Sequence, residues 1–122
     1  MPAEQQVPEP IERYFDHLAN DEFEAAAAQF TEDCEYYHPP NFRDEVLVES
    51  RDALHAYFAD ERGPKDIEHS FVKVVVDGDT CGLIGRLTGG DIDGEDFFVS
   101  YAELEDDLIS YYMAGLLKGH VD

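Results

Sequence analysis

The chain has 122 residues, of which 43% are hydrophobic and 12% aromatic, and this is enough apolar material for one folded domain and too much for a disordered chain. Its 29 Asp and Glu residues outnumber its 8 Lys and Arg residues, so the formal net charge is -21 at pH 7. Such a charge repels nucleic acids and anionic lipid surfaces, and we therefore exclude both as partners.

Acidic residues are spread over the whole chain rather than gathered in one tail. Together with the scarcity of Lys, this distribution is typical of proteins from extremely salt-loving organisms, where the Debye length falls to about 3 Å or less and self-repulsion is screened. We therefore expect a halophilic origin and a loss of stability at low salt.

The cysteine count and the first residues bear on the compartment. Two cysteines, Cys34 and Cys81, are too few for a disulfide framework, and we interpret both as small buried residues. Residues 1–7 are polar and acidic and contain neither a signal peptide nor a membrane span. We expect a cytoplasmic protein without a membrane partner.

Three helices are predicted in the first half of the chain. Apolar residues recur at helical spacing over residues 10–19, 23–30 and 50–62. Pro10 suits the first turn of the first helix, where no amide donor is needed, and Ser50 is a good N-cap for the third.

A strand is predicted between the second and third helices. It covers residues 34–38 and ends at His38, because the following Pro39 cannot continue a ladder of hydrogen bonds. Residues 46–48 form either a short strand or part of a lid over residues 40–49, and the sequence leaves this choice open.

From residue 67 onwards the apolar period changes to two, which predicts an antiparallel meander of four strands. The strands cover residues 68–76, 80–88, 95–104 and 108–116. Gly82, Gly85 and Gly115 would let long strands bend, so we expect a strongly curved sheet. Because both faces carry apolar residues, we also expect a homodimer that forms through the outer face of the sheet.

This order of elements resembles the NTF2-like α+β fold, and within it the SnoaL-like branch of small cavity-bearing proteins. The residues that carry the resemblance are IERYF at 11–15, NDEF at 20–23, FTEDC at 30–34, YHP at 37–39, SRDAL at 50–54 and AELED at 102–106. The resemblance implies one α+β domain over residues 1–122, with residues 1–8 as a flexible extension. It also implies a cystatin-like, cone-shaped barrel in which three N-terminal helices pack on a curved, mainly antiparallel sheet around an apolar pocket.

Two residues match catalytic positions of ketosteroid isomerases in this fold. His38 stands where these isomerases place a carboxylate general base, and an imidazole, with an ordinary pKa of about 6.5, is suited to proton transfer at neutral pH. Tyr14 matches their hydrogen-bond donor to the oxyanion, which could contribute about 3 kcal/mol. The alternatives are a hydrogen-bonded histidine at a strand end and a tyrosine packed in the core.

The pocket is expected to be lined by aromatic and small polar side chains from the third helix and the last two strands. The candidate ligand-binding residues are Tyr57, Phe58, Phe98, Ser100, Tyr111 and Met113. Strand alternation places Tyr111 and Met113 on one face, opposite Tyr112. Ser100 stands where the isomerases carry a protonated carboxylic acid, and it is a weaker donor.

The sequence thus predicts a protein that binds a small apolar molecule and acts, if it is an enzyme, as an isomerase or cyclase-like lyase without a cofactor. Two alternatives remain open, a non-catalytic binding or dimeric interaction module of the same fold and an epoxide-hydrolase-like hydrolase. The five histidines contain no pair with the spacing of a metal site, so no metal is expected.

Overall fold

The structure is a computed structural model, and it describes residues 7–39, 45–62, 67–89 and 94–116. The helices are α1 (Glu9–Ala19), α2 (Phe23–Ala27) and α3 (Arg51–Ala56), the last of which continues as the π-helical turn η1 (Tyr57–Arg62). The strands are β1 (Phe30–His38), β2 (Val46–Val48), β3 (Ile67–Asp77), β4 (Thr80–Gly89), β5 (Glu95–Glu105) and β6 (Leu108–Leu116).

The strands form one six-stranded sheet in the order β2-β1-β6-β5-β4-β3. All neighbouring strands are antiparallel except β1 and β6, which are parallel. The predicted curved, mainly antiparallel sheet is therefore confirmed. However, β2 and β3 are open edges, so the closed, cone-shaped barrel expected from the sequence is not confirmed.

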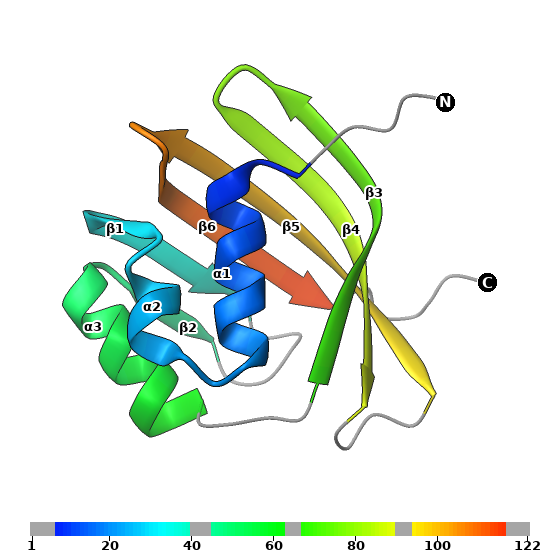
Figure 1. Cartoon of the computed structure of the whole chain (residues 1–122), viewed down its shortest axis with the longest axis horizontal. Helices are drawn as coiled ribbons and strands as arrows, with labels where there is room; N and C mark the ends of the chain where they lie inside the picture. The colour runs from blue at the N-terminus through cyan, green and yellow to red at the C-terminus, as the bar shows by residue number, and fades with distance from the viewer. Residues whose placement is uncertain (1–6, 40–44, 63–66, 90–93, 117–122) are drawn as a thin grey trace.

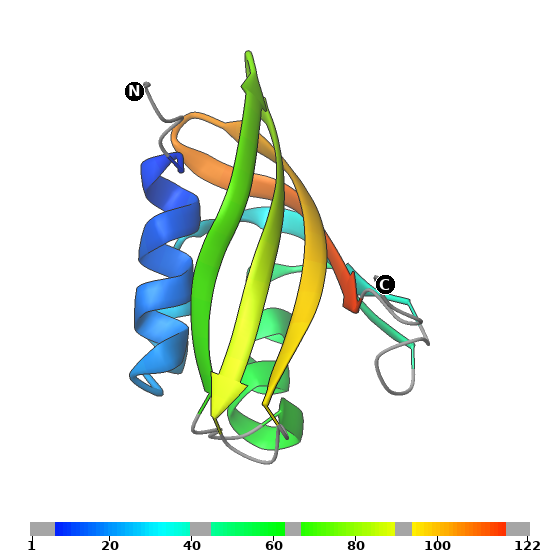
Figure 2. The same cartoon turned by 90° about the vertical axis from the view of Figure 1, so that its right-hand side faces the viewer.

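The helices lie together on one face of the sheet, which we call the inner face (Figure 1). In the view from the side, β3, β4 and β5 are curved and α1 lies on one side of them (Figure 2). No described helix covers the opposite face, which we call the outer face. The apolar stripe of α1 faces the sheet, and its buried residues are Pro10, Ile11, Tyr14, Phe15 and Leu18.

The N-cap predicted for the third helix is present in the structure. The Ser50 hydroxyl accepts a hydrogen bond from the Ala53 amide at 3.1 Å, which caps α3. The second half of this predicted helix is different, since Tyr57–Arg62 adopts the wider π-helical turn. A π-helical turn is rare and is frequently found at functional sites.

The boundary between α2 and β1 is earlier than predicted. The helix ends at Ala27, and Phe30 already belongs to β1, where it pairs with Ile109 of β6. The amide of Ile109 donates to the carbonyl of Gln29 at 2.8 Å. Pairing with a strand 79 positions further along the chain (109 minus 30) therefore overrides the helical spacing of Phe30.

Three further predictions meet different outcomes. Both cysteines are buried, as predicted. Residues 40–44, which are the first half of the predicted lid, and residues 1–6 of the predicted extension lie outside the described residues. Within the described ranges, no helix has the length and apolar character needed to span a bilayer.

Gly85 fixes the position of an aromatic ring on the inner face. A Cβ atom at this position would overlap two carbons of the Phe98 ring and would lie 3.0 Å from the Ser70 carbonyl oxygen. The absence of a side chain thus lets Phe98 lie across β4, with its ring centroid 5.9 Å from that of Phe15.

We predict that Gly85→Ala lowers the free energy of unfolding by about 1–3 kcal/mol, because the added methyl group displaces Phe98 from a packed position. Urea denaturation followed by far-ultraviolet circular dichroism measures the change. Gly82→Ala is the matched control, since the nearest atom to its Cβ would be a carbonyl oxygen 3.9 Å away. Equal losses for the two variants would contradict this account of Gly85.

Candidate functional site

His38 is the end of a chain of buried hydrogen bonds that joins α1, β1 and β6. Its Nδ1 atom lies 2.6 Å from the carbonyl oxygen of Ala114, and its Nε2 atom lies 2.8 Å from the Tyr36 hydroxyl. The Tyr36 hydroxyl in turn lies 3.2 Å from the Tyr14 hydroxyl. We call these groups the His38 chain.

Chemistry fixes the direction of each bond in the His38 chain when the imidazole is neutral. A carbonyl oxygen only accepts, so Nδ1 carries the proton and donates to Ala114. The neutral Nε2 then only accepts, so the Tyr36 hydroxyl donates to it. Tyr36 has one proton to give, and therefore Tyr14 donates to the oxygen of Tyr36.

Aromatic rings surround the His38 chain. The Tyr36 ring is stacked on Tyr112, with centroids 5.4 Å apart and an interplanar angle of 19°. Phe58 packs on both phenols of the chain, 6.0 Å from Tyr14 and 5.6 Å from Tyr36. The exposed fraction falls from 7% at His38 to 2% at Tyr36 and 2% at Tyr14, so that His38 is the end nearest to solvent.

The part of the interior that the structure describes holds few polar side chains. Where the structure describes burial, His38 and Ser100 are the buried polar side chains, and every described carboxylate is at least partly exposed. Burial raises the pKa of Tyr112 well above its usual range, although a hydrogen bond with Ser100 opposes the rise. Tyr112 is therefore a neutral phenol at physiological pH.

The two cysteines do not supply a nucleophile. Burial raises the pKa of Cys34 to about 11, and burial also raises the pKa of Cys81. Both side chains are therefore thiols at neutral pH, and the thiol is much less reactive than the thiolate.

The structure brings most of the predicted site residues to the inner face. Tyr14, His38, Tyr57 and Phe58 are linked by ring contacts through Tyr36 or through one another. Phe98 and Ser100 are buried on the inner face of β5, and Ser100 pairs with Ala114, the acceptor for His38.

Tyr111 and Met113 do not belong to this group. They share one face, opposite Tyr112, as alternation predicted, but it is the outer face. Met113 pairs with Tyr37 and Tyr101, and the Tyr111 ring lies 6.0 Å from that of Tyr101. The grouping of Tyr111 and Met113 with Phe98 and Ser100 around one hollow is therefore wrong, because the parity of β6 places Tyr112 and Ala114 inside instead.

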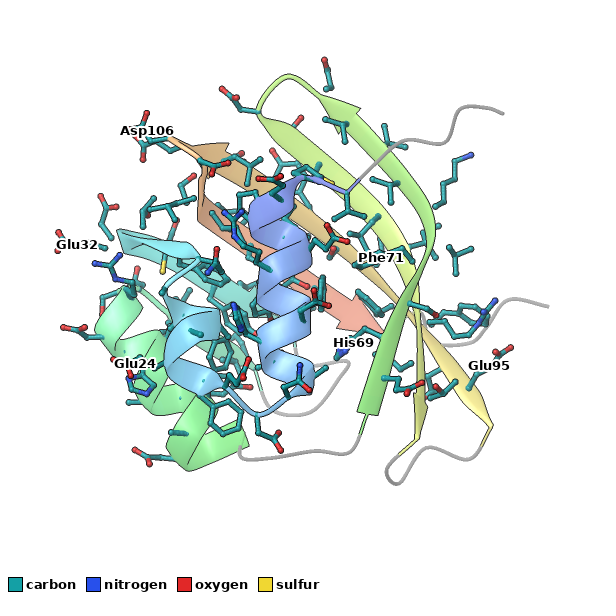
Figure 3. All side chains as sticks on the ribbon, in the orientation of Figure 1. Glu24, Glu32, His69, Phe71, Glu95 and Asp106 are labelled. Atoms are coloured by element: carbon teal, nitrogen blue, oxygen red, sulfur yellow. The ribbon has the colours of Figure 1, made fainter. Side chains whose placement is uncertain are left out.

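Two inner-face residues were not assigned a role from the sequence. Tyr36 connects His38 to Tyr14, and alternation along β1 could have placed it on the same face as His38. His69 of β3 packs on Phe15, with ring centroids 4.9 Å apart, and on Phe98 at 5.8 Å. Figure 3 shows His69 and Phe71 in the space between β3 and α1, while Glu95 lies at the start of β5.

The described residues contain few groups that could bind a metal ion or act in a hydrolase. They contain no group of three or more His, Cys, Asp or Glu side chains placed to hold a metal. Arg86 of β4 is engaged on the outer face of the sheet, beside Phe97 of β5. Its Nε atom lies 3.0 Å from Glu95, and its guanidinium lies over the Phe97 ring.

Comparison with known proteins agrees with the fold. A family model described as a SnoaL-like domain matches residues 11–112. A search of curated proteins finds no match to the sequence.

Solved structures with the same fold are numerous. A candidate ketosteroid isomerase from Kribbella flavida superposes with a TM-score of 0.74 at 22% identity, covering 94% of this chain and 80% of the other. An NTF2-like protein of unknown function from Burkholderia xenovorans gives 0.74 at 12% identity, with 93% and 84% covered. An epoxide hydrolase of the LEH-like type from M. tuberculosis gives 0.69 at 14% identity, with 89% and 80% covered. At these identities the likeness establishes an NTF2-like fold and leaves the activity open.

Proposed function

Because this chain belongs to the family of SnoaL-like domains, we propose that it binds a small, apolar, carbonyl-bearing molecule and transfers a proton on it without a cofactor. The reaction class is that of an isomerase or a cyclase-like lyase. The observation that carries the proposal is the His38 chain, in which a buried imidazole lies 2.8 Å from the Tyr36 hydroxyl and that hydroxyl lies 3.2 Å from the Tyr14 hydroxyl.

Each residue has a role in this proposal. His38 is the base, because an imidazole exchanges protons near neutral pH. The Tyr14 hydroxyl faces the ligand oxygen, where a phenol in a buried site stabilises developing negative charge. Tyr57 and Phe58 of η1 and Phe98 of β5 supply apolar contacts. Ser100 is the next residue of β5 on the same face as Phe98.

A non-catalytic binding module is the second candidate, and one observation favours it. Both ring nitrogens of His38 are already hydrogen-bonded, to Ala114 and Tyr36, so Nε2 can take a proton from a ligand only after the Tyr36 hydroxyl turns away, whereas a structural histidine needs no such change. The hydrolase alternative has less support, since no Asp, Glu or Arg side chain is buried where the structure describes burial.

The test of the proposed function is isotope exchange. The full chain is incubated in D₂O with a β,γ-unsaturated ketosteroid and with 2-acetylnaphthalene, and deuterium at the carbon next to the carbonyl is measured by mass spectrometry. Exchange above the buffer rate supports proton transfer. Binding without exchange supports the non-catalytic module, and neither binding nor exchange contradicts both.

We also propose that two copies associate through the outer face of the sheet. A row of paired residues crosses all six strands on this face: Leu47, Tyr37, Met113, Tyr101, Gly82 and Val75. We call it the outer row. Its two ends are exposed, with 56% of Leu47 and 54% of Val75 accessible, and the neighbouring Val99 is 41% exposed. An apolar band of this kind is typical of an interface.

Charges beside the outer row favour a second copy as the partner. Lys73 and Glu45 each lie two residues before an end of the row, at opposite edges of the sheet. A twofold axis parallel to the strands would place the β3 edge of one copy over the β2 edge of the other. Lys73 of each copy would then meet Glu45 of the other, which supports an isologous pair.

We predict that Val99→Asp raises the dissociation constant of this dimer by at least about 100-fold, because it places an unpaired charge within each half of the interface. Sedimentation equilibrium measures the change. Ala56→Asp adds the same charge to the exposed surface of α3 and should leave the association unaltered. A wild-type chain that remains monomeric at all concentrations would contradict the dimer.

Salt should strengthen the association. With a net charge of -21 on each copy, repulsion opposes contact, and raising the salt from 0.1 M to 1 M shortens the Debye length from about 10 Å to about 3 Å. The same screening supports adaptation of the acidic surface to high salt. Halophilic origin and a cytoplasmic location remain predictions from the sequence.

A further inference from the structure

We propose that Tyr37 of one copy packs over Gly82 of the other, and that this contact determines how two copies associate through the outer face. The inference rests on the proposed dimer and deepens it, because it names the residues that select the orientation of the second copy. Its basis is the order of large and small residues along the outer row.

Gly82 leaves a gap in the outer row. Its neighbours in the row are Tyr101 on β5 and Val75 on β3, and both carry large side chains. Apart from adjacent residues of the chain, a Cβ atom on Gly82 would meet only the Ser100 carbonyl oxygen, 3.9 Å away. The backbone of Gly82 is also outside the left-handed region. In contrast to Gly85, Gly82 therefore lies where its own chain has room for a side chain.

Tyr37 occupies the position in the other half of the row that corresponds to Gly82. It is second from the β2 end of the outer row, and Gly82 is second from the β3 end. The Tyr37 hydroxyl donates to a carboxylate oxygen of Glu45 at 3.0 Å, which restrains the ring before a second copy arrives. A restrained side chain loses less entropy on association, so Tyr37 is suited to an interface contact.

One twofold axis brings these two residues together. An axis that lies in the interface and crosses the centre of the outer row at a right angle reverses the row in the second copy. Tyr37 then faces Gly82 in two symmetry-related contacts, and the strands of the two sheets remain nearly aligned, as is common in stacked sheets. The same axis places Lys73 opposite Glu45, so the size pattern and the charges agree.

The other axis available to a face-to-face pair runs along the row and places each residue against its own copy. Gly82 would then face Gly82, and the gap would stay unfilled. Val99, which is 41% exposed, lies two residues before Tyr101 on β5 and would face Glu103, two residues beyond it. An unfilled space and a carboxylate against an apolar side chain both weaken an interface. The row therefore favours the axis that pairs Tyr37 with Gly82.

Within one copy, Tyr37 and Gly82 cannot touch. They lie on β1 and β4, which are separated by β6 and β5. Neighbouring strands are about 4.8 Å apart, so the two residues are separated by about 14 Å. Substitutions more than about 7–10 Å apart normally have additive effects. Coupling between these two positions in the dissociation constant must therefore act across the interface.

The test is a double-mutant cycle on the full chain, measured by sedimentation equilibrium in 1 M salt, a condition that screens the repulsion between copies. Gly82→Leu fills the gap and should raise the dissociation constant of the dimer about 10–100-fold. Tyr37→Ala removes the opposing ring and should raise it about tenfold. The double variant places the leucine over the shortened side chain. Its dissociation constant should therefore lie at least about tenfold below the value expected from adding the two free-energy changes.

Phe97→Ala is the matched control for Tyr37→Ala. It also removes an aromatic ring from the outer face, but Phe97 lies four residues along β5 from Tyr101 of the outer row. Combined with Gly82→Leu, it should give additive effects. This control separates a local contact from a general loss of apolar surface. A bend in β4 that required glycine would likewise give no rescue by Tyr37→Ala.

The failure of the inference and the failure of the dimer give different results. Additive effects of Tyr37→Ala and Gly82→Leu overturn the inference and leave the dimer intact, whereas a wild-type chain that stays monomeric at all concentrations overturns both. Should Gly82→Leu fail to fold, as judged by circular dichroism, cross-linking decides. A short bifunctional maleimide should join an equimolar mixture of Tyr37→Cys and Gly82→Cys chains more efficiently than either variant alone. A higher or equal yield for either variant alone overturns the inference.

Discussion

His38→Asn is expected to lower the rate of deuterium exchange on an apolar ketone by about 10²–10⁴-fold, the range that a well-placed general base contributes. An asparagine amide can still donate to the Ala114 carbonyl, which His38 Nδ1 approaches at 2.6 Å. The variant therefore keeps the link between β1 and β6 while it removes the basic Nε2. Mass spectrometry of the ketone in D₂O measures the rate, and circular dichroism verifies the fold.

A matched control for this prediction is His55→Asn. His55 lies exposed on α3, so the same change of side chain occurs outside the inner face. It should leave the exchange rate within about twofold of the wild type. If His38→Asn also keeps the full exchange rate, His38 is not the base, and the non-catalytic interpretation of its two hydrogen bonds gains support.

Phe58→Ala is expected to lower the free energy of unfolding by about 3–5 kcal/mol, the usual cost of emptying a buried aromatic position. The Phe58 side chain is fully buried and packs on Tyr14, Tyr36 and Tyr57. Because domains of this size are stable by only about 5–15 kcal/mol, a large part of the stability would be lost. Urea denaturation followed by circular dichroism measures the change, since the chain contains no Trp to report by fluorescence.

Phe23→Ala provides the comparison for Phe58. Phe23 begins α2 and is only partly buried against the same core. Its removal should cost less than half as much, because the site is already open to water on one side and leaves a smaller cavity. If the two variants lose similar free energies of unfolding, the packing of Phe58 from η1 on the His38 chain is not a main source of stability.

The fold could be predicted from the sequence because its signals are local. Ser50 caps α3, Pro10 occupies the first turn of α1, and the change from a helical to a twofold apolar period places the meander. The error near Phe30 has the same origin. Phe30 has helical spacing from the residues before it, but it pairs with Ile109, and no local pattern reveals a partner so far along the chain.

The candidate site could be predicted only in part. The proline after His38 marks the end of β1, and alternation indicates that Tyr111 and Met113 share a face. Alternation alone does not indicate which face is covered, and this is decided by the pairing of Tyr112 with Tyr36 beneath the helices. The connection from His38 through Tyr36 depends on side-chain geometry, which periodicity does not contain.

The parallel pairing of β1 with β6 also determines when the site can exist during synthesis. His38 and its carbonyl acceptor are separated by 76 positions along the chain. Contacts of such long range form slowly, after much loop entropy has been lost. On the ribosome, the imidazole emerges well before Ala114, so a nascent chain passes through a period in which the tautomer of His38 has no backbone anchor. The proton-handling unit is therefore completed only when the last strand docks.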